Sequence, residues 1–185
     1  MNEYSLAKVQ LHNNDNVDVA IVRIPQVYYD NLVQNGINLS FFTFDTDSYK
    51  ISEMKNIGVM EGNGVFVLGY PMALVGRTRQ YVILRGGVIS RIHDLLEGFS
   101  TDYIIDAPVF PGNSGGPVIV KPELTRIEGT KAITESRLIG LVKSYIPYRD
   151  VAISPQTGRT RVVFEENTGL TNVEPVDYII ETILQ

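Results

Sequence analysis

The sequence predicts an all-β domain, a barrel or sandwich, that ends in a single helix. Most apolar residues fall into short runs rich in β-branched side chains, and glycine or proline turn signals separate these runs. Apolar residues at helical spacing occur only after Pro175, at positions 176, 179, 180, 183 and 184. The 185-residue chain is 44% hydrophobic, which is enough to bury the core of one domain.

The expected strands follow one another along most of the chain. The pattern fades between about Asn31 and Asn56, where we expect a linker between two subdomains. Residues 121–137 and 147–160 are rich in charged residues and turn formers, and we expect them to be loops. The strands are expected at 17–24, 65–68, 80–84, 88–92, 103–105, 117–120, 138–142 and 161–164.

Composition excludes several classes of function. Sixteen basic and 21 acidic residues give a net charge of −5, which argues against a nucleic-acid partner. The chain has no cysteine and only two histidines, His12 and His93, so neither disulfides nor a metal site is expected. No membrane-spanning run is present, and Met1–Lys8 does not resemble a signal peptide. We therefore expect no cofactor and no membrane contact, and the cysteine content favours a cytoplasmic location.

The stretch Pro111-Gly112-Asn113-Ser114-Gly115-Gly116-Pro117 has a direct chemical interpretation. Gly112 can adopt backbone angles closed to other residues, and so turn its N–H toward a point beside the Ser114 hydroxyl. The turn from Gly112 through Asn113 to Ser114 would then form an oxyanion hole. Gly115 and Gly116 would leave room for a neighbouring backbone. The alternative is a tight glycine-rich hairpin with an incidental serine.

This stretch resembles the nucleophile motif of trypsin-like, chymotrypsin-fold serine peptidases. The resemblance is strongest to their disulfide-free bacterial branch, which includes the HtrA-type proteases. Asp18-Val19-Ala20-Ile21 looks like the strand that carries the triad aspartate, and Val67–Pro71 like the opening of the second barrel. Residues 139–145 look like the strand that lines the specificity pocket. The resemblance covers roughly residues 14 to 185. Residues 86–89, Asp106 and residues 169–170 also match the family pattern, but each of these matches is weak by itself.

The resemblance implies a serine endopeptidase, a hydrolase that cleaves polypeptides without a cofactor. Ser114 would attack the peptide carbonyl, a histidine would take its proton, and Asp18 would orient that histidine. It also implies a double β-barrel. Residues 1–50 would be the remnant of the N-terminal barrel plus a linker, and residues 51–185 the C-terminal barrel with its helix.

The catalytic histidine of the family lies several tens of residues before the aspartate, and here 17 residues precede Asp18. Three explanations stay open. The chain is part of a longer protein, or it is a natural short homologue that no longer cuts, or His12 stands in as the base. We interpret His93 as a structural or surface residue. Losing one triad member typically costs on the order of 10⁶ in turnover, so we expect this chain alone to have little or no protease activity.

The resemblance also suggests where a substrate would lie. Lys143, Ser144 and Tyr145 would form one wall of the specificity pocket. An apolar wall opposite, made by residues 108–110 (Pro108, Val109 and Phe110), suggests a medium-sized apolar residue before the cleaved bond. Asn113 replaces the aspartate that digestive members use in zymogen activation, so that switch is not expected.

Two other expectations concern partners. An incomplete N-terminal barrel would expose a strand edge at 17–24, and a homo-oligomer could cover it. A non-catalytic protein-binding domain on the same fold is the alternative function, because a fold alone does not fix an activity. The glycine spacings at 62–64 and 112–116 do not fit a nucleotide-binding loop.

Overall fold

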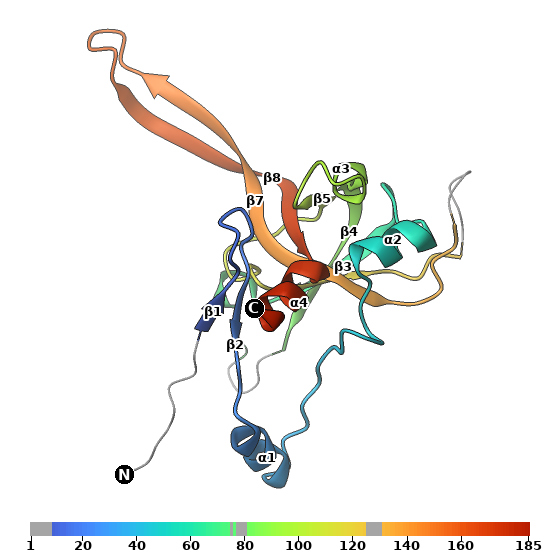
Figure 1. Ribbon diagram of the computed structural model, residues 1–185. Helices are drawn as coiled ribbons and strands as arrows, with labels where there is room; N and C mark the ends of the chain where they lie inside the picture. The colour runs from blue at the N-terminus through green and yellow to red at the C-terminus, as the bar shows by residue number, and fades with distance from the viewer. Residues whose placement is uncertain (1–8, 75, 77–80, 125–130) are drawn as a thin grey trace, which may run out of the picture.

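A closed six-stranded antiparallel barrel forms the centre of the molecule, in a computed structural model that describes residues 9–74, 76, 81–124 and 131–185 (Figure 1). The strand order is β3-β4-β5-β8-β7-β6, and β6 closes onto β3. The predicted β class and the C-terminal helix are therefore confirmed. The strands are β3 (Gly64–Gly69), β4 (Ile83–Arg91), β5 (Tyr103–Asp106), β6 (Pro117–Val120), β7 (Arg137–Ile153) and β8 (Thr160–Pro175).

Alternating side chains fill the barrel. In β3, Val65 and Val67 are fully buried, whereas Phe66 and Leu68 between them are partly exposed. Successive side chains of a strand point to opposite faces, so this alternation directs every second residue of β3 into the core. Three expectations from the sequence fall wholly or partly outside the described residues: the Met1–Lys8 segment, the start of the 80–84 strand, and part of the 121–137 loop.

The strand order determines where the serine turn lies. β5 and β6 follow one another in the chain, yet β8 and β7 lie between them in the barrel. The connection at 107–116 must therefore cross the ends of β8 and β7. Hydrogen bonds fix it there, from the Ala107 N–H to the Gly169 oxygen (3.0 Å) and from the Gly115 N–H to the Val142 oxygen (2.8 Å).

The expectation of a single helix is wrong. Besides α4 (Val176–Leu184), the structure contains α1 (Gln26–Gln34), α2 (Ile51–Ile57) and α3 (His93–Leu96). The first helix buries none of its residues, so it has no apolar stripe from which it could be predicted. The bounds of the second helix are fixed by contacts at its two ends. The Lys50 N–H donates to the Glu53 carboxylate (2.8 Å), and Gly58 ends the helix in the left-handed conformation.

A second barrel is not confirmed in the described residues. Between residues 9 and 50 the chain forms two short strands, β1 (Val9–Leu11) and β2 (Ala20–Val22), which pair with each other. Val17 and Val19 pack with Ile179 of α4 in a small separate core. Two strands of this length are too few to close a barrel.

The hairpin of β7 and β8 extends well beyond the barrel as a two-stranded arm (Figure 1). The expectation of a loop at 147–160 is wrong, because residues 147–153 pair with residues 160–167 and only 154–159 form the turn. Charged residues such as Arg149 and Asp150 make this segment resemble a loop. They are tolerated in a strand here because the arm is exposed on both faces.

Candidate active site

The backbone of the serine turn requires glycine at position 112. Gly112 has a φ of +96°, and a Cβ atom there would lie 2.3 Å from the Tyr70 carbonyl oxygen. A Cβ at Gly116 would lie 2.2 Å from the Leu68 oxygen, so the turn also fits closely against β3. Both glycines therefore serve the close approach of two backbones.

Two N–H groups of the turn have no partner among the residues that the structure describes. The Asn113 N–H donates to the Phe110 oxygen (2.9 Å) and the Gly116 N–H to the Asn113 oxygen (2.9 Å). The Gly112 and Ser114 N–H groups have no hydrogen-bond partner in the described part of the chain. Two unpaired donors on either side of Asn113 are the arrangement that an oxyanion hole needs. Asn113 itself is fully buried, and its Oδ1 accepts from the Phe110 N–H (3.2 Å), so it holds the turn together.

The Ser114 hydroxyl is exposed at the surface and lies against β7. Its Oγ donates to the Lys143 carbonyl oxygen at 3.1 Å. A nucleophilic serine must give its proton to a base, and a carbonyl oxygen does not take it. Ser114 is therefore accessible but not activated in this structure.

Neither histidine is bonded to Ser114. His12 contacts Glu181 through Nε2 (3.2 Å) and accepts the Asn14 N–H at Nδ1 (3.0 Å). His93 contacts Glu61 through Nδ1 (2.5 Å) at the start of α3. Both ring nitrogens of His12 are thus occupied by groups other than the serine.

Asp18 is not brought into contact with Ser114 either. Its carboxylate is exposed and has no hydrogen-bond partner among residues that the structure describes. The Asp18 N–H donates to Glu174 Oε1 (3.0 Å), which attaches this segment to β8. The structure therefore presents a candidate nucleophile and a candidate triad aspartate without a base between them.

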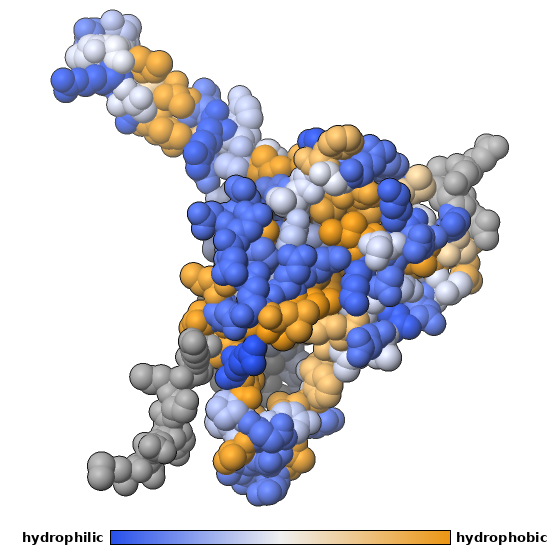
Figure 2. Space-filling view, viewed as in Figure 1, coloured by the Kyte–Doolittle hydropathy of each residue, from blue (hydrophilic) through white to orange (hydrophobic). Residues whose placement is uncertain are grey.

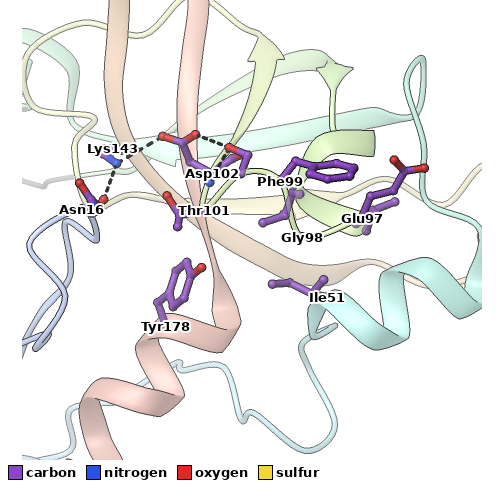
Figure 3. A pocket seen from close by; sticks show the side chains of 12 residues that line it. Asn16, Ile51, Glu97, Gly98, Phe99, Thr101, Asp102, Lys143 and Tyr178 are labelled. Carbon is purple, nitrogen blue, oxygen red and sulfur yellow. Dashed lines mark hydrogen bonds and ion pairs between the residues drawn. The ribbon is translucent and has the colours of Figure 1, made fainter.

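A cluster of three charged side chains, Lys143, Glu174 and Asp102, joins β7 and β8 to the residue that precedes β5. The Lys143 Nζ lies 2.7 Å from Glu174 and 3.3 Å from Asp102, and it also donates to the Asn16 oxygen (3.1 Å; Figure 3). Burial lowers the pKa of the Lys143 ammonium, but hydrogen bonds and charge from Glu174 and Asp102 outweigh it and raise the pKa overall. Because Glu174 is only 1% exposed, its charge needs the lysine.

Sequence reasoning missed this cluster. Its three members lie on different strands or loops and are brought together only by the closed barrel. The sequence gives no signal for Glu174, because Asp177 and Glu181 are other acidic residues in the same stretch. The cluster borders a pocket of about 850 Å³ that Ile51, Phe99 and Tyr178 also line (Figure 3).

The predicted substrate walls have mixed positions. Pro108 and Ser144 are exposed, whereas Val109 is buried in the barrel core. The Arg85 guanidinium lies over the Phe110 ring, with its central carbon 5.1 Å from the ring centre. The Tyr145 hydroxyl donates to Glu165 (2.6 Å). The Lys143 ammonium is held by Glu174 and Asp102, and Lys143 lines the pocket of about 850 Å³ described above.

Over the described residues, no three histidine or acidic side chains gather closely enough to hold a metal ion, and no helix is long and apolar enough to cross a membrane. Comparison of the sequence with protein-family models and with curated proteins gave no match.

Proposed function

We propose that this chain carries the nucleophile and the oxyanion hole of a trypsin-like serine endopeptidase. The observation that supports the proposal best is the serine turn itself. It exposes the Ser114 hydroxyl, and within the described part of the chain the N–H groups of Gly112 and Ser114 are unpaired. A glycine-rich hairpin without a function has no need for two free donors beside a serine.

The proposed chemistry is acyl transfer to Ser114. The Ser114 oxygen attacks a peptide carbonyl as its proton leaves for a base. The carbonyl oxygen becomes an oxyanion, which accepts hydrogen bonds from the Gly112 and Ser114 N–H groups. The base returns the proton to the leaving amine, and water then hydrolyses the acyl-enzyme. No cofactor takes part, and the substrate is a polypeptide.

The base is the missing component. His12 and His93 are both committed to carboxylates elsewhere, so we propose that a group other than these two would have to supply it. The Ser114 hydroxyl would then rotate away from the Lys143 oxygen to reach that base. On its own the chain should cleave casein no faster than a Ser114→Ala variant does.

Added imidazole tests this proposal, because it can replace the missing base. A fluorophosphonate probe forms a bond from phosphorus to the serine oxygen as fluoride leaves, and imidazole takes the serine proton. We expect slow labelling that depends on imidazole and maps to Ser114 by peptide mass spectrometry. Ser114→Ala should abolish it, and Ser52→Ala, which removes an exposed serine of α2, should leave it unchanged.

The second candidate is a non-catalytic protein-binding domain. It is favoured by the hydrogen bond from the Ser114 hydroxyl to the Lys143 oxygen, which leaves the serine unactivated. On this alternative, imidazole produces no Ser114 adduct at any concentration. The labelling experiment therefore separates the two candidates.

A further inference from the structure

The strands of the arm, residues 147–153 and 160–167, pair with no other strand of the described structure, and Asn167 at the base donates to the Val109 oxygen. The two strands of the arm pair only with each other, because β6 pairs with β7 no farther than Leu141 and β5 pairs with β8 no nearer the tip than Leu170. A single two-stranded hairpin is marginally stable in water. Both outer edges of the arm also present unpaired backbone groups.

The arm exposes apolar side chains on both faces, and Figure 2 shows them gathered along its length. Val151 and Val163 are directly opposite on one face, and Ala152 and Val162 on the other. The exposed apolar residues of the arm are Tyr148, Val151, Ile153, Val162, Val163 and Phe164, at 45% to 61% exposure. Exposed apolar surface of this kind is unfavourable in water and usually marks an interaction site. The arm therefore has the character of a binding surface.

The two edges of the arm are not equivalent. Pro147 lies in β7 at the base of the arm and has no N–H, so it interrupts any ladder along that edge. The β8 edge from Thr160 to Thr168 contains no proline. The β8 edge is therefore the better template for an added strand.

The charges of the β8 edge are complementary to themselves. In an antiparallel pairing of two such edges about a two-fold axis through Val163, Arg161 lies opposite Glu165 and Val162 opposite Phe164. Each of these pairs occurs twice. A pairing centred on Phe164 loses the charge pairs, because Arg161 then faces Asn167 and Val163 faces Glu165. A pairing centred on Val162 places Arg159 opposite Glu165 and Arg161 opposite Val163, so in that register the affinity would depend on Arg159 and not on Arg161.

We propose that two copies of this chain dimerise through their β8 arms in this register and form a four-stranded antiparallel sheet. The Glu165 carboxylate, which would accept from Arg161 of the second copy, is already fixed in position. It accepts hydrogen bonds from Arg149 (2.9 Å) and from the Tyr145 hydroxyl (2.6 Å) of its own chain. Arg161 forms no ion pair within the described residues and is exposed. It is thus available to the Glu165 of a second copy.

Charge reversal tests the register. In Arg161→Glu, two glutamates face each other at both ends of the interface. In Glu165→Arg, two arginines do. Each variant should dimerise about tenfold more weakly than the original chain in sedimentation equilibrium. A 1:1 mixture of the two variants restores both charge pairs and should regain the original affinity as a heterodimer. Arg159→Glu, at the tip and opposite Asn167 in this register, is the matched control and should dimerise normally.

A disulfide test uses the absence of cysteine in the chain. Val163→Cys places two thiols beside the two-fold axis and should give a covalent dimer under mild oxidation. Val151→Cys is the control. In the four-stranded sheet its two copies would lie about three strand spacings, roughly 14 Å, apart, which a disulfide cannot span. A chain that stays monomeric at about 100 μM would overturn the proposal. Equal cross-linking of the two variants, or a mixture that fails to regain affinity, would overturn it as well.

Discussion

At residue 112, the backbone tolerates only glycine. Gly112→Ala adds a Cβ 2.3 Å from the Tyr70 oxygen and forces a positive φ on alanine. We expect the free energy of unfolding to fall by about 2–3 kcal/mol or more, and Ser114 labelling to be lost with it. Urea denaturation measures the first effect. Gly115→Ala is the matched control, because Gly115 also has a positive φ (+76°), but a Cβ added there would meet no atom within 4 Å. A loss there of about 1 kcal/mol is expected, and equal losses in both variants would contradict the account.

Lys143 neutralises a buried charge. Lys143→Met leaves the Glu174 carboxylate buried without its cation, and we expect the free energy of unfolding to fall by about 3–5 kcal/mol. The control is Arg91→Met, which breaks the solvent-exposed pair with Asp94 and should cost about 1 kcal/mol or less. Both values follow from urea denaturation at pH 7. If the two variants lose the same amount, Lys143 and Glu174 are not the buried pair described here.

Predictability at the residue scale depends on how local a feature is. The serine turn could be predicted from seven consecutive residues, because its glycines determine the backbone around Ser114. The pairing of Lys143 with Glu174 and Asp102 could not, because it depends on which strands the barrel places side by side. The commitment of His12 to Glu181 depends in the same way on the docking of α4 against β1 and β2.

Among the short elements, α3 depends on a carboxylate from another part of the chain. Glu61 Oε1 accepts the Ile92 (2.8 Å) and His93 (3.1 Å) N–H groups at the helix start. Burial raises the pKa of Glu61, but these N–H donors and the His93 side chain outweigh it and lower the pKa from 4.5 to about 2. A lowered pKa in the folded state gives stability that is present above pH 4.5 and is lost as the pH falls toward 2.

Glu61→Gln should therefore lower the free energy of unfolding at pH 7 by about 1–2 kcal/mol, after allowance for the partial exposure of the carboxylate. The difference from the original chain should shrink between about pH 5 and pH 2. Urea denaturation across this range measures it. Glu97→Gln, which removes a charge after the last residue of α3, should show no such pH dependence. Parallel curves for Glu61→Gln and the original chain would show that this carboxylate does not cap α3.

The α1 helix should be the least protected of the regular elements. It buries no residue, and Val27 is 81% exposed. An isolated helix of this length is marginal in water, so its amides should exchange at least ~100-fold faster than those of β3. Hydrogen–deuterium exchange with mass spectrometry compares the two segments directly. Protection of α1 equal to that of β3 would mean that a partner covers it in solution.

Elements with a repeated apolar pattern could be predicted, and short helices that bury one apolar side chain or none could not. The barrel strands and α4 have apolar patterns at the expected spacing. The arm has apolar side chains on both faces, so it has no alternating pattern. Its charged residues Arg149 and Asp150 led to the prediction of a loop. The short helices α2 and α3 are set by capping contacts, and α3 takes its cap from Glu61, about thirty residues earlier in the chain.

For the whole molecule, the closed barrel is what gives the serine turn its position. The turn crosses from β5 to β6 over the ends of β8 and β7, and hydrogen bonds to Gly169 of β8 and Val142 of β7 hold it there. The barrel class could be predicted from the sequence, because its strands have a clear period. How residues 9–50 contact the barrel could not be predicted from the sequence. The first part of this segment contacts Glu174, Lys143 and α4, and residues 47–49 contact Arg137 and Leu138 of β7, all of them far away in the chain.

The central claim is that Ser114 and the free N–H groups of Gly112 and Ser114 together form a site for a tetrahedral oxyanion. Boron-11 NMR in imidazole buffer, with a peptide boronic acid that ends in an apolar residue, tests it most directly. Boron becomes tetrahedral when the Ser114 oxygen adds to it and imidazole takes the serine proton. We predict a tetrahedral boron signal at one equivalent, absent in Ser114→Ala and weakened in Gly112→Ala. A signal that stays trigonal, or a tetrahedral signal that persists in Ser114→Ala, would contradict the claim.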